Sequence, residues 1–383
     1  MSFEKGNNYM SDWIKARAIN VLIAGGGTGG HLFPGIAIAE LFMECNPENG
    51  ILFVNTGKPF EIDTLSNAGF AHKKITAQGI KGLSIFKKAI AVIKTPKGVY
   101  GAFRILKTFK PDIVIGVGGY SSGPMVLGAW FFRIRIAIHE QNILPGITNR
   151  ILSYFTDRIY VSFKTTAHRF NPEKVKVTGN PVRKEIREYV ADSREDIPDG
   201  RIKKRPFTIL VVGGSQGAHS INMIIIEAMK NLKEMEHLYF IHQTGSKDED
   251  TVRKAYLGNE IPCTVQAFFY DMPVQYTKAD LIICRAGATT VAEITVLGKA
   301  VIFIPFPQAA DNHQVLNARE LEDAGAAEVI LENEIDGSIL AERIEHYVTS
   351  TDELEDMASR SRAFGRPDAA MEIVKDCYGM ITE

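Results

Sequence analysis

Cysteine is scarce in this sequence, and its spacing excludes two classes of protein. The chain has 383 residues and 4 cysteines, at positions 45, 263, 284 and 377. No two of them follow a C-x-x-C pattern, so neither a disulfide framework nor a cysteine metal site is indicated. Aspartate and histidine do not cluster either. We therefore expect reduced thiols, no bound metal and no tightly bound cofactor.

The sequence also lacks a segment typical of a membrane helix or a signal peptide. Residues 113–132 carry no formal charge and are long enough to span a bilayer. Glycine, serine and proline between Gly116 and Pro124 instead predict a buried strand, a loop and a helix. Residues 1–18 carry charges of both signs and no apolar core, so we expect no signal peptide there.

Acidic residues are absent between Thr64 and Pro111, a stretch that is rich in basic ones. The basic residues are Lys73, Lys74, Lys81, Lys87, Lys88, Lys94, Lys97, Arg104, Lys107 and Lys110. Aliphatic and aromatic side chains alternate with them, which predicts contact with an anionic membrane surface. Nucleic acid, the usual alternative partner of a basic run, fits less well because of these apolar neighbours. A solvated basic face is the other alternative.

The segment from Val21 to His31 is the most informative motif that is present. Four apolar residues predict a buried strand, the glycines a tight turn, and Pro34 the first turn of a helix. Glycine lets the backbone approach a ligand, and a helix N-terminus offers N–H groups to an anion. His31 adds a titratable group at the same place. Together these features predict a phosphate or polyol ligand beside acid–base chemistry.

The same glycines also satisfy the fingerprint of a dinucleotide-binding fold, which is the alternative enzyme class. That fold needs an acidic residue at the tip of the second strand to hold a ribose. The next strand, Ile51–Asn55, ends in asparagine. The sequence therefore argues against NAD, which stays the alternative interpretation of this motif.

The chain repeats one pattern of strand, glycine-rich loop and helix in two halves. This alternation predicts an α/β fold with two doubly wound parallel sheets, whose ligands bind at the carboxyl ends of the strands. A charged stretch from Arg183 to Pro206 separates the halves. The predicted strands are Val21–Ala24, Ile51–Asn55, Ile113–Val117, Ile136–His139, Arg158–Val161, Thr208–Val212, Leu238–Gln243, Thr264–Ala267, Leu281–Cys284, Val301–Pro305 and Ala327–Val329.

Motifs along nearly the whole chain resemble those of the MurG family of bacterial cell-wall N-acetylglucosaminyltransferases. They are GGTGGH, GGYSSGP, HEQN, TGNPVR, GGSQGA, RAGATT and HQ-x-x-NA, in this order. The resemblance implies the GT-B architecture, two Rossmann-like domains facing across a deep cleft. It further implies an acceptor- and membrane-binding domain over residues 1–181, a donor domain over residues 182–363, and a last helix over residues 364–383 that returns to the first domain.

The resemblance assigns the donor, UDP-N-acetylglucosamine, mainly to motifs of the second half. Glu293 is expected to hold the ribose hydroxyls, the backbone of Phe269 to contact the uracil, and Arg183 to lie beside the nucleotide. Other positions are expected to contact the phosphates or the sugar. They are Thr28, Gly29, Gly30, His31, Asn142, Ser215, Ala288, Thr289, Thr290, Gln314 and Asn317.

The acceptor implied by the resemblance is undecaprenyl-pyrophosphoryl-N-acetylmuramyl-pentapeptide, and its side of the site contains the candidate bases. His31 is the first candidate, because an imidazole can accept a proton near neutral pH. Glu140 is the competing base. Gly27, Tyr120 and Ser121 are expected to contact the acceptor diphosphate. Structural roles for each of these residues are the alternatives.

By analogy with the family, we expect transfer with inversion, in which UDP leaves toward Arg183 and helix N-termini. A divalent cation would be at most accessory. A peripheral position on the cytoplasmic face of the inner membrane and contacts with cell-division or elongation proteins are also implied. A UDP-sugar epimerase and a non-enzymatic nucleotide-sugar-binding scaffold are the alternative functions.

Overall fold

The computed structural model describes residues 17–75, 96–193, 205–214, 216–233 and 236–382. The chain forms two compact units, residues 1–184 with 367–383, and residues 185–366. Each border lies three residues after the predicted one, at 184 instead of 181 and at 366 instead of 363.

The first unit is built on a parallel sheet of seven strands in the order β3-β2-β1-β4-β5-β6-β7. The strands are β1 (Asn20–Gly25), β2 (Gly50–Asn55), β3 (His72–Lys74), β4 (Ile113–Gly118), β5 (Arg135–Glu140), β6 (Arg158–Val161) and β7 (Val175–Val177). The helices are α2 (Gly29–Cys45), α3 (Pro59–Asn67), α5 (Pro96–Phe109), α6 (Ser122–Phe131), α7 (Ile147–Leu152), η1 (Ser153–Phe155), α8 (Lys164–Ala167) and α17 (Ala369–Thr382).

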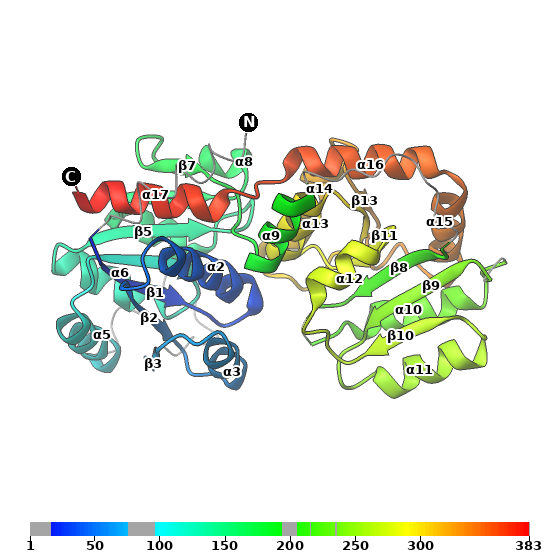
Figure 1. Cartoon of the computed structure of the whole chain (residues 1–383), viewed down its shortest axis with the longest axis horizontal. Coiled ribbons are helices and arrows are strands. Elements are labelled where there is room, and N and C mark those ends of the chain that lie inside the picture. The colour runs from blue at the N-terminus through cyan, green and yellow to red at the C-terminus, as the bar shows by residue number, and fades with distance from the viewer. Residues whose placement is uncertain (1–16, 76–95, 194–204, 215, 234–235, 383) are drawn as a thin grey trace. The chain divides into compact units, whose positions relative to one another are not determined.

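The apolar run of β1 is explained by helices on both faces of this sheet (Figure 1). Val21 and Ile23 pack on one face with α2 and α17. Leu22 and Ala24 point to the other face and pack with α5 and α6. Successive strand residues alternate between faces, so a strand covered on both sides must be apolar throughout.

The second unit repeats this plan with a parallel sheet of six strands in the order β10-β9-β8-β11-β12-β13. The strands are β8 (Phe207–Val212), β9 (Leu238–Gln243), β10 (Cys263–Gln266), β11 (Leu281–Cys284), β12 (Ala300–Phe303) and β13 (Glu328–Val329). The helices are α9 (Lys184–Ser193), α10 (His219–Met229), α11 (Glu249–Gly258), α12 (Met272–Lys278), α13 (Ala288–Leu297), η2 (Ala310–Asn312), α14 (His313–Glu322), α15 (Gly337–Thr349) and α16 (Thr351–Phe364).

The last helix, α17, is part of the first unit although it follows the second in the sequence. The ring of Tyr378 packs against Phe42 of α2, with centroids 5.6 Å apart. The hydroxyl of Tyr378 accepts a hydrogen bond from Nδ2 of Asn49 at 2.7 Å. Asp376 pairs with Arg158 of β6 at 2.8 Å. Apolar burial and these polar contacts together fix α17 to the unit.

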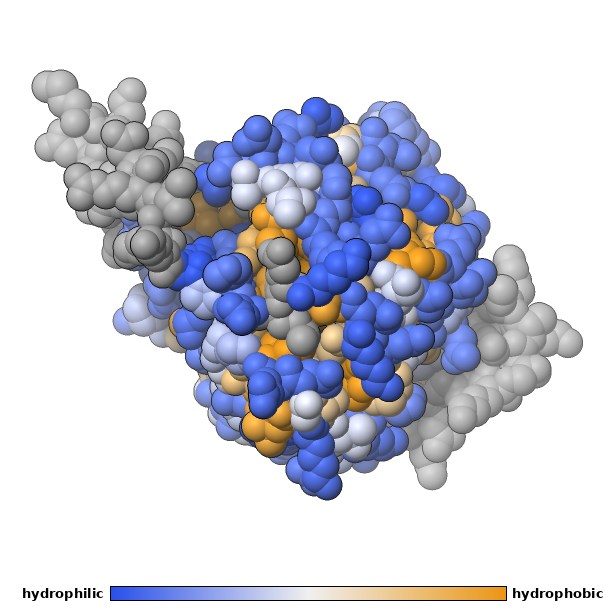
Figure 2. Space-filling view, turned by 90° about the vertical axis from the view of Figure 1, so that its right-hand side faces the viewer, coloured by the Kyte–Doolittle hydropathy of each residue, from blue (hydrophilic) through white to orange (hydrophobic). Residues whose placement is uncertain are grey.

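Every strand that the sequence predicts is present, and residues 113–132 form β4 and α6 as expected. The short strands β3 and β7 at the two edges of the first sheet were not predicted. Among the described residues, no helix has both the length and the apolar character needed to cross a bilayer. The face drawn in Figure 2 is mainly hydrophilic, with small separate hydrophobic areas, as is usual for surface in contact with water.

Candidate active site

The strand order places glycine-rich loops at the switch point of each sheet, where ligands of such folds bind. In the first unit, β1 and β4 are neighbours. After β1 the chain continues to β2 on one side of this pair, and after β4 it continues to β5 on the other side. The loops after them are Gly26–Thr28 and Gly119–Ser121. In the second unit the corresponding neighbours are β8 and β11. Each unit therefore presents its own candidate site.

The two loops of the first unit touch at positions that only glycine can occupy. Gly119 has φ +82°, and a Cβ there would lie 2.5 Å from the carbonyl oxygen of Gly26. Gly118 has φ +96°, and a Cβ there would lie 2.8 Å from Nδ1 of His31. Both the backbone conformation and the close approach exclude larger residues. The ring of His31 thus packs directly on the loop after β4.

Helix α2 begins at Gly29, whereas the sequence predicted its start at Pro34. The carbonyl of Thr28 accepts hydrogen bonds from the amides of His31 and Leu32, both at 3.2 Å. Gly29, Gly30 and Pro34 have low helix propensity, which is why the sequence predicted a later start. In the structure, the loop before this turn is held by hydrogen bonds. As a result Gly30 and His31 belong to the first turn of a helix, where amides can bind an anion.

A buried carboxylate that the sequence analysis did not identify fixes this loop. Glu61 of α3 is fully buried and accepts a hydrogen bond from the amide of Gly27. It also accepts hydrogen bonds from the amides of Thr56 at 3.1 Å and Lys58 at 3.0 Å. The amino group of Lys58 donates to the carbonyl of Gly27 at 3.2 Å. A glutamate three residues after a helix N-cap is the signal that could have revealed it.

A chain of hydrogen bonds connects His31 to the HEQN motif after β5. Nδ1 of His31 lies 3.2 Å from Oε1 of Gln141. Nε2 of Gln141 lies 2.9 Å from the carbonyl of Val117 and 3.1 Å from Nδ1 of His139. Nε2 of His139 lies 3.2 Å from the carbonyl of Gly179. Burial lowers the pKa of His139 to about 4, so this ring is neutral near pH 7.

Glu140 is only 2% exposed, and both of its carboxylate oxygens accept hydrogen bonds. One oxygen accepts from the backbone amide of Asn142 at 3.0 Å. The other accepts from the amide of Gly146 at 3.0 Å and from Nδ2 of Asn149 at 2.8 Å. Burial raises the pKa of Glu140 although these donors oppose the shift. This geometry makes Glu140 the organiser of the loop between β5 and α7.

Three further predicted residues occupy different environments in the first unit. Tyr120 is 51% exposed on the loop after β4. Ser121 is fully buried, and its hydroxyl has no hydrogen-bond partner among the described atoms. A contact of Ser121 with a diphosphate would therefore require its neighbours to move. The guanidinium of Arg183 stacks on the ring of Phe33 in α2, with 5.3 Å to the centroid.

The second unit presents the N-terminus of α13 at its switch point. Gly287 is the N-cap, and Ala288, Thr289 and Thr290 form the first turn, which contains no acidic residue. Their amides have no acceptors within the helix itself, which suits an anion. The loop before α10 contains Gly217 (φ +76°), where a Cβ would lie 2.0 Å from the carbonyl oxygen of Thr244. Ser215 of the same loop lies outside the described residues.

The other predicted donor contacts are largely buried. The amide of Phe269 already donates to Oε1 of Gln243 at 2.9 Å, and Glu293 on α13 is 2% exposed. Oε1 of Gln314 accepts from the amide of Phe306 at 2.9 Å. Asn317 is fully buried and donates to the carbonyl of Ala286 at 3.3 Å. Asn317 thus ties α14 to the RAGATT loop, and its contact with a sugar stays a prediction.

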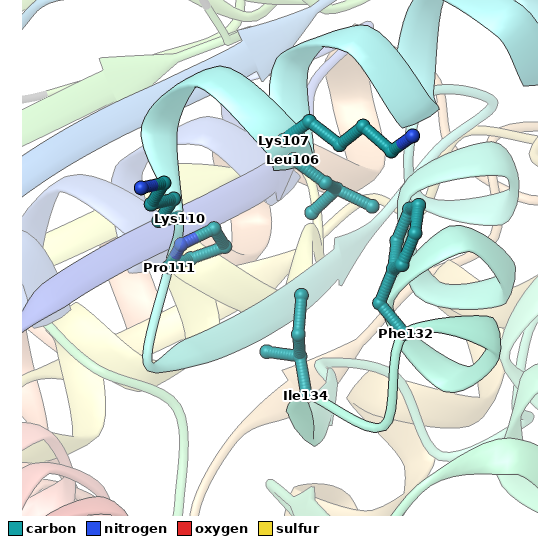
Figure 3. A pocket seen from close by; sticks show the side chains of 6 residues that line it. All are labelled: Leu106, Lys107, Lys110, Pro111, Phe132 and Ile134. Atoms are coloured by element: carbon teal, nitrogen blue, oxygen red, sulfur yellow. The ribbon is translucent and has the colours of Figure 1, made fainter.

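A cavity of about 420 Å³ lies near the amino-terminal ends of β4 and β5, away from the glycine-rich loops (Figure 3). It is bounded by the end of α5 and by the turn that precedes β5. Its lining residues are Leu106, Lys107, Lys110, Pro111, Phe132 and Ile134. The amino group of Lys107 lies 5.8 Å from the ring centroid of Phe132. The cavity therefore has apolar walls and two cationic side chains.

Among the described residues there is no group of three side chains suited to a metal ion.

Comparison with known proteins defines the class. The model of the glycosyltransferase family 28 N-terminal domain matches residues 21–161, and that of the C-terminal domain matches residues 208–373. The chain belongs to glycosyltransferase family 28, and it is a UDP-N-acetylglucosamine-dependent hexosyltransferase.

Relatives of nearly equal length have names that specify both a donor and an acceptor. A protein of Anaeromyxobacter sp. strain Fw109-5 is 43% identical over 364 residues, which are 95% of this chain and 94% of that protein. One of Syntrophus aciditrophicus strain SB is 42% identical over 95% of this chain and 99% of that protein. Both are named UDP-N-acetylglucosamine–N-acetylmuramyl-(pentapeptide) pyrophosphoryl-undecaprenol N-acetylglucosamine transferase.

Solved structures agree on the fold. A crystal structure of MurG from Acinetobacter baumannii is 30% identical, with a TM-score of 0.75, over 94% of this chain and all of that one. A UDP-N-acetylglucosamine 2-epimerase from Neisseria meningitidis is 16% identical over 93% of this chain and 99% of that one, with a TM-score of 0.63. The epimerase shares the fold alone, so the transferases are the relatives that bear on function.

Proposed function

We propose that the chain transfers N-acetylglucosamine from UDP-N-acetylglucosamine to the 4-hydroxyl of a lipid-linked N-acetylmuramyl-pentapeptide. The observation that carries this proposal is the 43% identity, over 95% of the chain, to a transferase named for these substrates. The product would be the disaccharide-linked lipid used in peptidoglycan synthesis. An epimerase is less well supported, because the epimerase structure is only 16% identical to this chain whereas the transferase is 43% identical. An oxidoreductase using NAD is less well supported, because β2 ends in Asn55 and has no acidic residue at its tip.

The first unit would bind the acceptor and supply the base. His31 lies in the first turn of α2, where helix amides and the loop glycines can hold a diphosphate. Glu140 is a weaker candidate base, because its oxygens already accept hydrogen bonds from Asn142, Gly146 and Asn149. Tyr120 is exposed next to this loop and is a candidate acceptor contact. We therefore assign the base to His31 and a positioning role to Glu140.

The second unit would bind the donor. The N-terminus of α13 suits a negative diphosphate, because its first turn contains no acidic residue and the helix dipole is positive there. The loop before α10 would bind the same group. Glu293 and Phe269 stay the predicted contacts of ribose and uracil. Because Phe269 already donates its amide to Gln243, uracil would have to use the carbonyl of Phe269 or displace Gln243.

In the reaction, the 4-hydroxyl oxygen would attack the anomeric carbon of the donor sugar while its proton passes to His31. The bond to UDP breaks on the opposite side, so an α-linked donor gives a β-linked product. Arg183 and the helix amides would stabilise the departing UDP. These fixed donors can replace a divalent cation, so we expect a chelator to leave the transfer rate within about twofold.

Docking to the membrane would use one surface of the first unit, here called the α5–α6 surface. It consists of Tyr100, Phe103, Arg104, Lys107, Trp130 and Phe131. Trp130 and Phe131 are 55% and 64% exposed, and Phe131 stacks on Phe103 with centroids 5.1 Å apart. Exposed aromatic and cationic side chains together suit the headgroup layer of an anionic membrane. The cavity of Figure 3 shares Lys107 with this surface.

We propose peripheral attachment at the cytoplasmic face of the inner membrane on this basis. Of the basic residues that predicted it, Lys81, Lys87, Lys88 and Lys94 lie outside the described residues. Cell-division and elongation proteins stay predicted partners on the strength of the family resemblance alone.

The decisive experiment for the function is UDP release by the purified chain with UDP-N-acetylglucosamine, with and without a soluble analogue of the lipid-linked acceptor. Release that requires the acceptor, with appearance of the disaccharide product, supports transfer. Isomerisation of the donor sugar without acceptor would instead identify an epimerase. Donor binding without either reaction would identify a binding scaffold.

A further inference from the structure

The hydrogen bonds around His31 end at two backbone carbonyls, and this decides where each hydrogen lies. A carbonyl oxygen can only accept. The carbonyl of Gly179 faces Nε2 of His139 at 3.2 Å, so that nitrogen carries the hydrogen. The His139 ring is neutral because it is fully buried, so its Nδ1 has a lone pair and accepts.

The side-chain amide of Gln141 is oriented by the same logic. The carbonyl of Val117 accepts at 2.9 Å and Nδ1 of His139 accepts at 3.1 Å, so both neighbours require a donor. Only the NH₂ group of Gln141 can supply two hydrogens there. The atom that faces Nδ1 of His31 at 3.2 Å is therefore the amide oxygen, which accepts only.

We propose that Gln141 is a positioning residue that holds the hydrogen of the neutral His31 ring on Nδ1. The lone pair then lies on Nε2, and Nε2 is the atom that takes the proton of the acceptor hydroxyl. The tautomer of a histidine is generally set by the hydrogen bond of its other nitrogen. The catalytic part of this inference rests on the proposed transferase function, whereas the tautomer does not.

We call the hydrogen-bond chain from His31 through Gln141 to His139 the relay. It accounts for the buried Gln141 and His139, which have no role if His31 is considered alone. Gln141 and His139 are both buried, and neither can be replaced by an apolar residue without leaving the other with an unmet hydrogen bond. Gly118 is the neighbour that lets the His31 ring reach Gln141, because any side chain there would meet Nδ1. Three charged groups lie close to these residues in the structure or the chain: Glu140 precedes Gln141, and Glu61 and Lys58 form hydrogen bonds with Gly27.

The tautomer can be measured on the unmodified full-length chain by nitrogen NMR with ¹⁵N-labelled histidine. The resonances of His31 are identified by their loss in the His31→Asn variant. At a pH where the ring is neutral, we expect Nδ1 to carry the hydrogen and Nε2 to be unprotonated. A hydrogen on Nε2 would overturn the proposal. This measurement needs no substrate and no folded Gln141 variant.

Kinetics test the same relay independently. Gln141→Met removes the acceptor, and we expect kcat to fall by about 10- to 100-fold, which is no more than the roughly 10²- to 10⁴-fold that general acid–base catalysis itself contributes. The KM for UDP-N-acetylglucosamine should stay within about twofold, because donor binding is assigned to other residues.

A variant with both His31→Asn and Gln141→Met tests whether Gln141 acts through His31. In the His31→Asn background, Gln141→Met should cause no further loss, because the two residues act as one unit. Equal losses in both backgrounds would show that Gln141 acts without His31 and would overturn the proposal. If the unmodified chain shows no acceptor-dependent transfer, the proposed function fails, while the NMR result still decides the tautomer.

Discussion

A side chain larger than hydrogen at position 118 would meet the ring of His31. In Gly118→Ala the added Cβ would lie 2.8 Å from Nδ1, and the backbone there has φ +96°. We expect the ring to shift, kcat to fall by at least about tenfold, and stability to drop by about 1–3 kcal/mol. Acceptor-dependent UDP release and thermal unfolding measure the two effects.

Gly69→Ala is the matched control for this substitution. Gly69 also has a left-handed conformation, with φ +74°, but no atom lies within 4 Å of an added Cβ. It should therefore share the cost of backbone strain and keep the transfer rate. Similar losses of kcat in both variants would mean that contact with His31 is not the cause.

The sequence identified His31 as a candidate base but not the residues that hold it in place. His31 and Gln141 are 110 positions apart, and Gly27 and Glu61 are 34 apart. Such contacts exist only after β1, β2, β4 and β5 have come together in one sheet. A polar residue in a loop after a strand gives no indication of its partner, so Gln141 was indistinguishable from its neighbours in HEQN.

At the scale of secondary structure, prediction worked where strands are buried on both faces. An uninterrupted apolar run such as Val21–Ala24 has few alternatives, and the structure confirms it as part of β1. The edge strands β3 and β7 have the sequences HKK and VKV. An edge strand has a neighbouring strand on one side only, and the residues of β3 and β7 are partly exposed. Their sequences therefore lack the apolar run by which a buried strand is recognised. Helix α2 was predicted to begin late because its first turn depends on contacts outside the helix.

Substitutions on helix α5 can test the proposed membrane attachment. Arg104 and Lys107 are exposed on it, and each basic residue near an anionic surface contributes about 1 kcal/mol. Replacing both by alanine should weaken binding to vesicles of phosphatidylglycerol and phosphatidylethanolamine by roughly 30-fold at low salt. The difference should shrink at high salt because exposed charges are screened. Co-sedimentation with vesicles measures it.

Lys230→Ala with Lys254→Ala is the charge-matched control, because both lysines are exposed on the second unit. We expect this variant to bind vesicles nearly as well as the unmodified chain. If the two double variants weaken binding equally, net charge rather than the α5–α6 surface accounts for attachment.

At the scale of the whole molecule, the two units repeat one design with different contents. Both sheets have a first strand beside the fourth, and both place glycine-rich loops and a helix N-terminus at that switch point. The first unit contains the hydrogen-bond chain from His31 through Gln141 to His139. We therefore expect a division of labour in which the first unit performs the proton transfer and the second unit holds the nucleotide.

The most direct test of this division measures turnover and donor binding together in His31→Asn. We expect kcat for acceptor-dependent UDP release to fall by about 10²- to 10⁴-fold, as is usual when a general base is lost. The Kd for UDP-N-acetylglucosamine, measured by calorimetry, should stay within about threefold of the original. Full turnover in this variant would contradict the account, as would a loss of donor binding large enough to explain the lost activity.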